Sequence, residues 1–202
     1  MIIKHENKEP KIDPSAYIAP NATICGDVTI GKGTRIMFGA QIIAESNPIT
    51  IGENCIILEN AVVRAAGAGK LSIGDNCLIG PNAHLASCEI ENDVFIATGA
   101  SVFHGSKIGS GAEIRINATV HLKTIFTANE VLPIGWIAIG NPMKMFAPKD
   151  NNEIWEIQEA LNFPDLVYGL AEREDMKNAN TKLCQIMSQR LSTHMDDEIL
   201  KA

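Results

Sequence analysis

The histidines and cysteines are among the side chains of this sequence that could bind a metal or transfer a proton. The cysteines have no CxxC spacing and are Cys25, Cys55, Cys77, Cys88 and Cys184. Thiolate zinc sites and disulfide frameworks need other spacings, so we expect reduced cysteines that serve as packing residues. His5 and His194 lie in terminal segments and are assigned no role. His84, His104 and His121 lie in the middle of the chain, where an imidazole can act as an acid or base near neutral pH.

The elements that carry these histidines are set by a six-residue repeat. An aliphatic residue recurs every six positions, with two insertions and one shortened step, and these anchors are Ile18, Ile24, Ile30, Ile36, Ile42, Ile51, Ile57, Val63, Ile73, Ile79, Leu85, Ile90, Ile96, Val102, Ile108, Ile114 and Val120. A small residue, such as Ala22, Ala40 or Ala61, follows most anchors after four positions. We therefore predict that the anchor and the small residue point inward.

The third regular position of the repeat predicts a corner. Three residues after most anchors stands Asn, Asp or Gly, as at Asn21, Gly39 and Asn82, and these residue types tolerate a left-handed backbone. A strand and a corner in every hexad make a triangular coil of 18 residues. We expect a mainly β fold, a parallel β-helix of about six coils and about 30 Å in length. Its packed interior leaves no room for a ligand.

This repeat resembles that of the hexapeptide-repeat proteins, which implies a left-handed β-helix. Two insertions interrupt it, SNPIT after Ile42 and AAGAGKLS after Val63, and a five-residue hexad follows Leu85. Interruptions in this order resemble those of the γ-class carbonic anhydrases. That resemblance implies a homotrimer, with the face carrying Val63 and Leu85 as the subunit contact. It also implies a zinc ion held between subunits by three histidines.

The resemblance places the three zinc ligands on Arg64, Pro81 and Ala86, and none of these is a histidine. A guanidinium is not a ligand at neutral pH, and the other two side chains have no donor atom. The arginine and aspartate that the family places in the first insertion fall on Ile43 and Glu45. Zinc-assisted hydration needs three protein ligands and an open position for water. We therefore expect the family's fold without its zinc chemistry, and negligible carbonic anhydrase activity.

A weaker metal hypothesis concerns His104 and His121. They fall on adjacent coils and neighbouring columns of the predicted prism, with Cα atoms about 6 Å apart. No third His, Cys or carboxylate falls beside them on the same columns, and two ligands make a poor zinc site. Surface hydrogen bonding is the favoured interpretation of this pair.

Three residues are candidates for a catalytic role in the predicted cleft, Glu59, Arg64 and His84. The family geometry implies that the column of Glu59 and Pro81 faces the column of Arg64 and Ala86 across the subunit interface, with His84 at the edge. One interpretation is a Glu59–Arg64 ion pair that only stabilises the trimer. The other is a site for a small anionic ligand, in which Arg64 binds a carboxylate and His84 is the acid or base.

Beyond Val120 the repeat is lost, and apolar spacing becomes helical from Ile154, Ile157 and Leu161 onward. We expect a left-handed β-helix domain over residues 1–147 and an amphipathic α-helical tail of at least two helices over residues 148–202.

Two other functions stay open beside the γ-carbonic anhydrase-like trimer. The sequence GNPMK from Gly140 to Lys144 resembles an ending of hexapeptide acyltransferases that lies near coenzyme A, but it also closes carbonic-anhydrase-type members. Such transferases carry a histidine on an extruded loop, and neither insertion contains one. The remaining alternative is a non-catalytic structural or regulatory trimer. Zinc and coenzyme A are the cofactors that the two enzyme classes imply.

The charge and hydropathy of the sequence limit the classes of partner and the cellular compartment that we expect. The net charge is −7 and no run of Lys or Arg occurs, which argues against nucleic acid or an anionic membrane. The first ten residues lack the apolar segment of a secretory signal, and no stretch approaches the length of a membrane span. We therefore expect a cytoplasmic protein.

Overall fold

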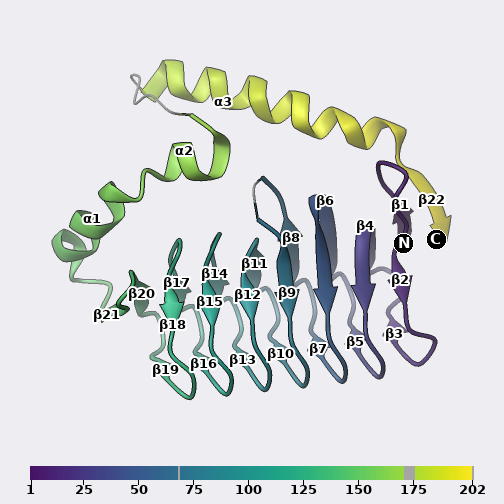
Figure 1. Ribbon diagram of the computed structural model, residues 1–202, viewed down its shortest axis with the longest axis horizontal. Helices are drawn as coiled ribbons and strands as arrows, with labels where there is room; N and C mark the ends of the chain where they lie inside the picture. Colours follow the sequence, from purple (N-terminus) through teal and green to yellow (C-terminus); the bar gives the residue numbers. More distant parts are fainter. Residues whose placement is uncertain (68, 171–175, 202) are drawn as a thin grey trace.

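In the computed structural model the repeat forms a triangular prism of stacked coils, a left-handed parallel β-helix, as expected (Figure 1). The structure describes residues 1–67, 69–170 and 176–201. The strands of the prism are β1 (Ile2–Lys4), β2 (Lys11–Ile12), β3 (Tyr17–Ile18), β4 (Thr23–Ile30), β5 (Arg35–Ile36), β6 (Gln41–Ile51), β7 (Ile56–Ile57), β8 (Val62–Ala65), β9 (Leu71–Ile73), β10 (Leu78–Ile79), β11 (His84–Ala86), β12 (Glu89–Ile90), β13 (Phe95–Ile96), β14 (Ser101–Val102), β15 (Lys107–Ile108), β16 (Glu113–Ile114), β17 (Thr119–Val120), β18 (Ile125–Phe126), β19 (Val131–Leu132) and β20 (Ile137–Ile139).

The strands line three faces of the prism. One face is a seven-stranded sheet in the order β19-β16-β13-β10-β7-β5-β3. The long strand β6 pairs with β8 through its first half and with β9 through its second half, so a single sheet wraps the other two faces. One of these carries β9, β12, β15 and β18. The other carries β8, β11, β14, β17 and β20, and we call it the helix-covered face because the C-terminal helices lie over it.

The core confirms the predicted alternation of inward and outward residues. In β7, Ile57 is completely buried whereas its neighbour Ile56 is 38% exposed. The small residues Ala40 and Ala61 are buried as well, because they fill the space beside each anchor. The prism interior is therefore packed with side chains along its length.

Most corners fall where the sequence predicts them, although Asn21 is not among the residues with a positive φ. Asn82 has a φ of 56°, and Gly99 has a φ of 67°. A Cβ on Gly99 would collide with Oδ1 of Asn117, the corner residue of the next coil. Corner residues thus stack along the edges of the prism, and glycine at position 99 leaves room for the Asn117 side chain.

The prism is longer than the sequence analysis predicted. The seven-stranded sheet shows at least seven coils, where about six were expected. The repeat continues past Val120 with Phe126, Leu132 and Ala138, all at most 1% exposed. An aromatic and an alanine in anchor positions hid this extension from a search for branched aliphatic residues.

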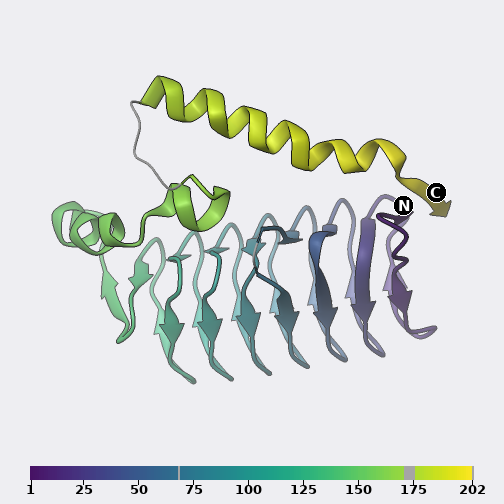
Figure 2. The same ribbon diagram turned by 45° about the horizontal axis from the view of Figure 1, so that its top comes forward.

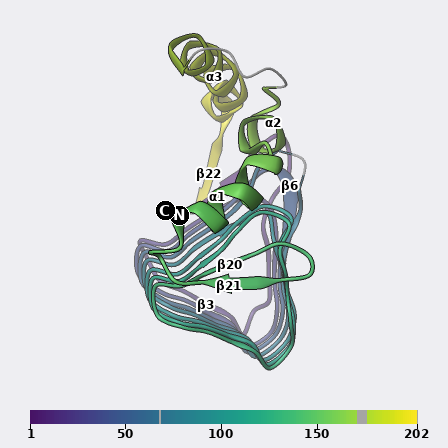
Figure 3. The same ribbon diagram turned by 90° about the vertical axis from the view of Figure 1, so that its left-hand side faces the viewer.

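The remaining chain folds back over the prism. It comprises β21 (Lys144–Phe146), α1 (Asn151–Ala160), α2 (Phe163–Tyr168), α3 (Met176–Leu191), a 3-10 helix (Ser192–Asp196) and β22 (Glu198–Lys201). Viewed end-on, α1, α2 and α3 lie on one side of the triangle (Figure 3). The helix α3 returns along the prism toward its first coil, where β22 pairs antiparallel with β1 (Figure 2). The helical tail is as expected, whereas the closing strand is not predicted by the sequence.

The cysteines agree with the expectation except at one position. All five are free, and Cys25, Cys55, Cys77 and Cys88 are buried. Cys184 is exposed on α3, so its interpretation as a packing residue is wrong. In the part of the chain that the structure describes, no helix has the length and apolar character needed to cross a membrane.

Candidate functional site

A cavity of about 290 Å³ lies between the helix-covered face and the C-terminal helices. The prism contributes Glu45, Arg64, His84 and His104 to its lining, and α3 contributes Arg190. Apolar groups of α2 and α3 complete the roof. The cavity therefore brings two arginines, one carboxylate and two imidazoles together.

Arg64 reaches this cavity from β8 and pairs with a residue that the sequence analysis did not place there. Its register with Ala86 of β11 is as predicted. The Arg64 guanidinium donates a hydrogen bond to the Glu45 carboxylate, which belongs to the neighbouring strand β6 and is 7% exposed. A buried carboxylate requires such a partner, because an unpaired one is strongly destabilising.

Glu59 lies at a corner, where its backbone carbonyl accepts a hydrogen bond from the Asn82 amide at 2.9 Å. It is not among the residues lining the cavity. An ion pair between Glu59 and Arg64 of different subunits stays a prediction.

His84 and His104 are held neutral at pH 7. Burial, and after it the positive charge of Arg64, lowers the pKa of the His84 imidazole below 6.5. Burial also lowers the pKa of His104, with a smaller contribution from His84. Neutral imidazoles can accept a proton, so either side chain can serve as a base.

The structure places His104 and His121 in two different cavities. His121 lies under α1, with Nε2 2.9 Å from Nε2 of Gln158. The centroid of the Phe103 ring lies 6.3 Å from the centroids of the His84 and His121 rings. His104 and His121 both have a buried Nδ1 without a hydrogen-bond partner among the described residues.

Comparison with known proteins shows what the chain is similar to. A family model described as "Bacterial transferase hexapeptide (six repeats)" matches residues 70–104. The chain is 32% identical over 167 residues to gamma carbonic anhydrase 2, mitochondrial, of Arabidopsis thaliana, a match that covers 79% of this chain and 58% of that protein. The chain is a γ-carbonic anhydrase-like hexapeptide-repeat protein. It spans somewhat over half the length of the plant relatives that it matches.

Other matches support the fold of this γ-carbonic anhydrase-like protein. A carbonic anhydrase of Geobacillus kaustophilus is 29% identical over 158 residues, covering 78% of this chain and 84% of that one. A crystal structure of a putative acetyltransferase from Bacillus cereus has a TM-score of 0.60 at 24% identity and covers 97% of this chain and 98% of that one. At this identity the likeness shows the fold alone.

The structure also brings together a group that the sequence analysis missed. His5, Cys25, His194 and Asp197 meet where the two ends of the chain lie side by side. The three-residue spacing of His194 and Asp197 was a local signal for a shared site. The other two side chains are brought there by pairing between strands that are far apart in sequence.

Proposed function

We propose that the cavity beside Arg64 binds a small carboxylate or carboxylate-like anion, and that the protein is not an active carbonic anhydrase. The observation that carries the proposal is the convergence of Arg64, His84 and His104 on one cavity of the helix-covered face. Arg64 and Ala86, which borders the same cavity, stand where the resemblance to γ-carbonic anhydrases puts two metal ligands.

The charge of the cavity favours an anion. With both histidines neutral, Arg64 and Arg190 contribute two positive charges and Glu45 one negative charge, leaving a net charge of +1. The Arg64 side chain remains 32% exposed beside its bond to Glu45. A guanidinium has five N–H donors in a planar fork, so it can hold Glu45 and still bind a second carboxylate.

The size of the cavity limits the ligand. A volume of about 290 Å³ lies at the lower end of the range found for small-molecule sites. We therefore propose a short carboxylate of a few carbon atoms or bicarbonate.

The histidines supply polar contacts and proton transfer. His104 also lines the cavity, so its imidazole can contact a bound ligand. His84 is neutral and lies close enough to Arg64 for the arginine's charge to lower its pKa. It can therefore hydrogen-bond an anion held by Arg64, and act as a base where the bound molecule carries a transferable proton.

The residues at the family's metal position do not fit zinc. Arg64 is engaged with Glu45, and the side chains of Pro81 and Ala86 have no donor atom. The relatives from Arabidopsis and Geobacillus are named carbonic anhydrases, but we derive no metal-dependent step at this cavity. No specific observation favours the acyltransferase alternative, because the likeness to the Bacillus cereus structure concerns the fold.

We also propose that the protein is a homotrimer, as the resemblance to γ-carbonic anhydrases implies. The C-terminal helices cover part of the face predicted as the subunit contact. A trimer formed through that face must include these helices in its interface.

The test is calorimetric titration of the full chain with acetate, malonate, succinate and bicarbonate. We expect Arg64→Ala to weaken the binding of the best ligand by at least about tenfold, since a hydrogen-bonded charge is lost. The matched control is Arg115→Ala, because Arg115 is also paired with a glutamate, Glu113 at 2.6 Å, but lies on the seven-stranded face. His84→Ala should also weaken binding, while Arg115→Ala should not.

The opposing results are equally definite. If none of these anions binds, or if binding survives Arg64→Ala, the anion site is wrong. Light scattering on each variant detects dissociation of the assembly. If Arg64→Ala dissociates the trimer and His84→Ala changes no ligand response, Arg64 serves assembly, as the structural alternative holds.

A further inference from the structure

Four side chains with metal-ligating atoms meet at the first coil, outside the cavity described above. They are His5, Cys25, His194 and Asp197. One ligand atom from each lies within 4.8 Å of all the others. Their donor set of two imidazole nitrogens, one sulfur and one carboxylate oxygen is the set that zinc accepts in proteins.

Two strand pairings position these residues. His5 follows β1, which pairs with β4 so that Ile3 lies opposite Cys25. Asp197 immediately precedes β22, which pairs with β1 so that Glu198 lies opposite Lys4. The site is therefore held by two strand pairings of β1.

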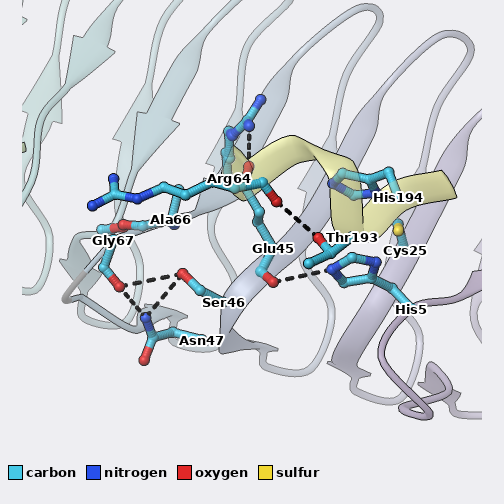
Figure 4. A network of polar contacts seen from close by, with 12 residues as sticks. His5, Cys25, Glu45, Ser46, Asn47, Arg64, Ala66, Gly67, Thr193 and His194 are labelled. Carbon is cyan, nitrogen blue, oxygen red and sulfur yellow. Dashed lines mark hydrogen bonds and ion pairs between the residues drawn. The ribbon is translucent and has the colours of Figure 1, made fainter. Parts of the chain in front are cut away.

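His5 is oriented as a metal-binding histidine. The side chain is 2% exposed, and its Nε2 lies 3.2 Å from the backbone carbonyl oxygen of Glu45. Metal-ligating histidines commonly donate one ring N–H to a carbonyl, which leaves the other nitrogen free for the metal. The opposite nitrogen, Nδ1, faces Asp197 (Figure 4 shows His5 between Glu45, Cys25 and His194).

The donor atoms converge on Asp197. Its carboxylate oxygens lie 2.6 Å from Nδ1 of His5, 2.8 Å from Nδ1 of His194 and 3.9 Å from Sγ of Cys25. The two imidazole rings are stacked, with centroids 4.2 Å apart. Ligand atoms around a tetrahedral zinc ion are separated by about 3.3 Å for bonds of about 2.0 Å. The nitrogen and oxygen atoms need to move apart by less than about 1 Å to admit an ion.

We propose that His5, Cys25, His194 and Asp197 form a tetrahedral site for a divalent borderline cation such as Zn²⁺. A thiolate and a carboxylate balance the two charges of the ion, and neutral imidazoles complete the coordination without adding charge. Such balance suits a site in which His5 and Cys25 are buried. With four protein ligands and no position for water, the ion has a structural role.

The bound ion would cross-link the C-terminal segment to the first coil of the prism. His194 and Asp197 belong to the segment that follows α3, whereas His5 and Cys25 belong to the prism. The helix α3 also supplies Arg190 to the roof of the anion cavity. Metal binding therefore stabilises the position of that roof, and it does so whether or not the cavity binds an anion.

The competing explanation is a cluster held by hydrogen bonds alone. In that case Nε2 of His5 contacts the Glu45 carbonyl and Nδ1 contacts the Asp197 carboxylate directly, at the same distances. A metal replaces only the contact at Nδ1, so direct measurement of metal content separates the two explanations.

The test uses the full chain, stripped with a chelator and titrated with Co²⁺ and then with Zn²⁺. We expect about one ion per chain, with the strong visible absorption of tetrahedral Co²⁺ and a thiolate-to-cobalt charge-transfer band. Zn²⁺ should bleach both features and raise the unfolding temperature. Cys25→Ser should abolish the charge-transfer band, and His194→Ala should weaken binding by at least about tenfold.

Two controls isolate the site. Cys184→Ser removes an exposed thiol on α3 and should leave the spectrum unchanged. Arg64→Ala should leave the stoichiometry unchanged, which separates this site from the proposed anion cavity. His194 is only partly buried, so its alanine variant keeps the fold, as circular dichroism can verify. The proposal is overturned if the wild-type chain takes up neither metal at micromolar concentration, or if the charge-transfer band survives Cys25→Ser.

Discussion

Arg64 and Glu45 explain at the level of single residues how the helix-covered face differs from a zinc site. Arg64 stands where the resemblance to the γ-carbonic anhydrases implies a zinc ligand, and a buried carboxylate from the neighbouring strand pairs with it. An ion pair in a partly buried place is sensitive to removal of either partner, because the remaining charge is left unpaired. The pair therefore holds Arg64 in one position beside His84.

The pKa of His84 should report the charge of Arg64. Removing the guanidinium removes one of the two causes that lower this pKa and leaves the Glu45 carboxylate unpaired in the same cavity, so we expect the pKa to rise in Arg64→Ala. Titration followed by NMR of the imidazole protons measures it. The control Arg115→Ala should leave the pKa of His84 where it is. An unchanged pKa in Arg64→Ala would show that the two side chains do not interact.

His121 should make the protein less stable in acid. Burial lowers the pKa of His121 in the folded state, so the unfolded chain binds more protons at pH values between the folded and unfolded pKa. Stability then decreases as the pH falls from about 7.5 to about 5.5. Urea unfolding at both pH values should show a smaller decrease for His121→Gln than for the wild type. An equal decrease would assign the acid sensitivity to other groups.

Part of the site could be predicted from residue spacing. The stacking of Arg64 on Ala86 follows from the coil period, and the register confirms it. The pairing with Glu45 did not follow, because the SNPIT insertion obscures the register. In the structure that insertion is absorbed within the long strand β6, opposite an irregularity in β4. Spacing alone cannot locate a side chain next to such an irregularity.

At the scale of the strands and corners, the stacked corner residues determine where glycine is needed. Gly99 and Gly135 both have a φ near 70°. They differ in the room available for a side chain. A Cβ on Gly99 would collide with the Asn117 side chain, whereas a Cβ on Gly135 would meet no atom within 4 Å.

This matched pair gives a prediction for the stability of the coils. Gly135→Ala should cost about 1 kcal/mol of unfolding free energy, the cost of a left-handed alanine. Gly99→Ala should cost about 1 kcal/mol more than Gly135→Ala, because the Asn117 side chain must leave its conformation to make room for the added Cβ. Urea unfolding measures both. Equal costs at the two positions would contradict the account of corner stacking.

Elements with a strong local pattern were predictable, and elements formed by tertiary contact were not. The anchors and corners repeat along the chain and therefore predict their own structure. Phe126 and Ala138 occupy the same inward position but depart from the branched aliphatic pattern. The sequence of β22 shows no strand pattern. The strand is formed by its antiparallel pairing with β1. The clustering of His5 with His194 depends on the same pairing.

For the whole molecule, the prism and the returning helix make one unit with the two ends side by side (Figure 1). The division at residue 147 stays a prediction; the structure shows that β21 ends at Phe146 and α1 begins at Asn151.

The assembly is the next property to measure. We expect light scattering at micromolar concentration to give three times the chain mass of 21.8 kDa, because the resemblance to γ-carbonic anhydrases implies a cyclic trimer. A monomeric mass would contradict it. Arg115→Ala, on the seven-stranded face, should have the mass of the wild type.

The protein has the fold of the γ-carbonic anhydrases, and our central proposal is that it lacks their metal chemistry at the helix-covered face. Stopped-flow CO₂ hydration, with the protein supplied with zinc or iron, tests the proposal most directly. If Arg64, Pro81 and Ala86 stand at the ligand positions, as the resemblance implies, no side chain there can hold a metal ion that lowers the pKa of a bound water. We predict a rate equal to the buffer background, even when zinc is bound stoichiometrically at His5 and its neighbours. A rate well above that background, reduced by substitutions at the helix-covered face, would contradict the account.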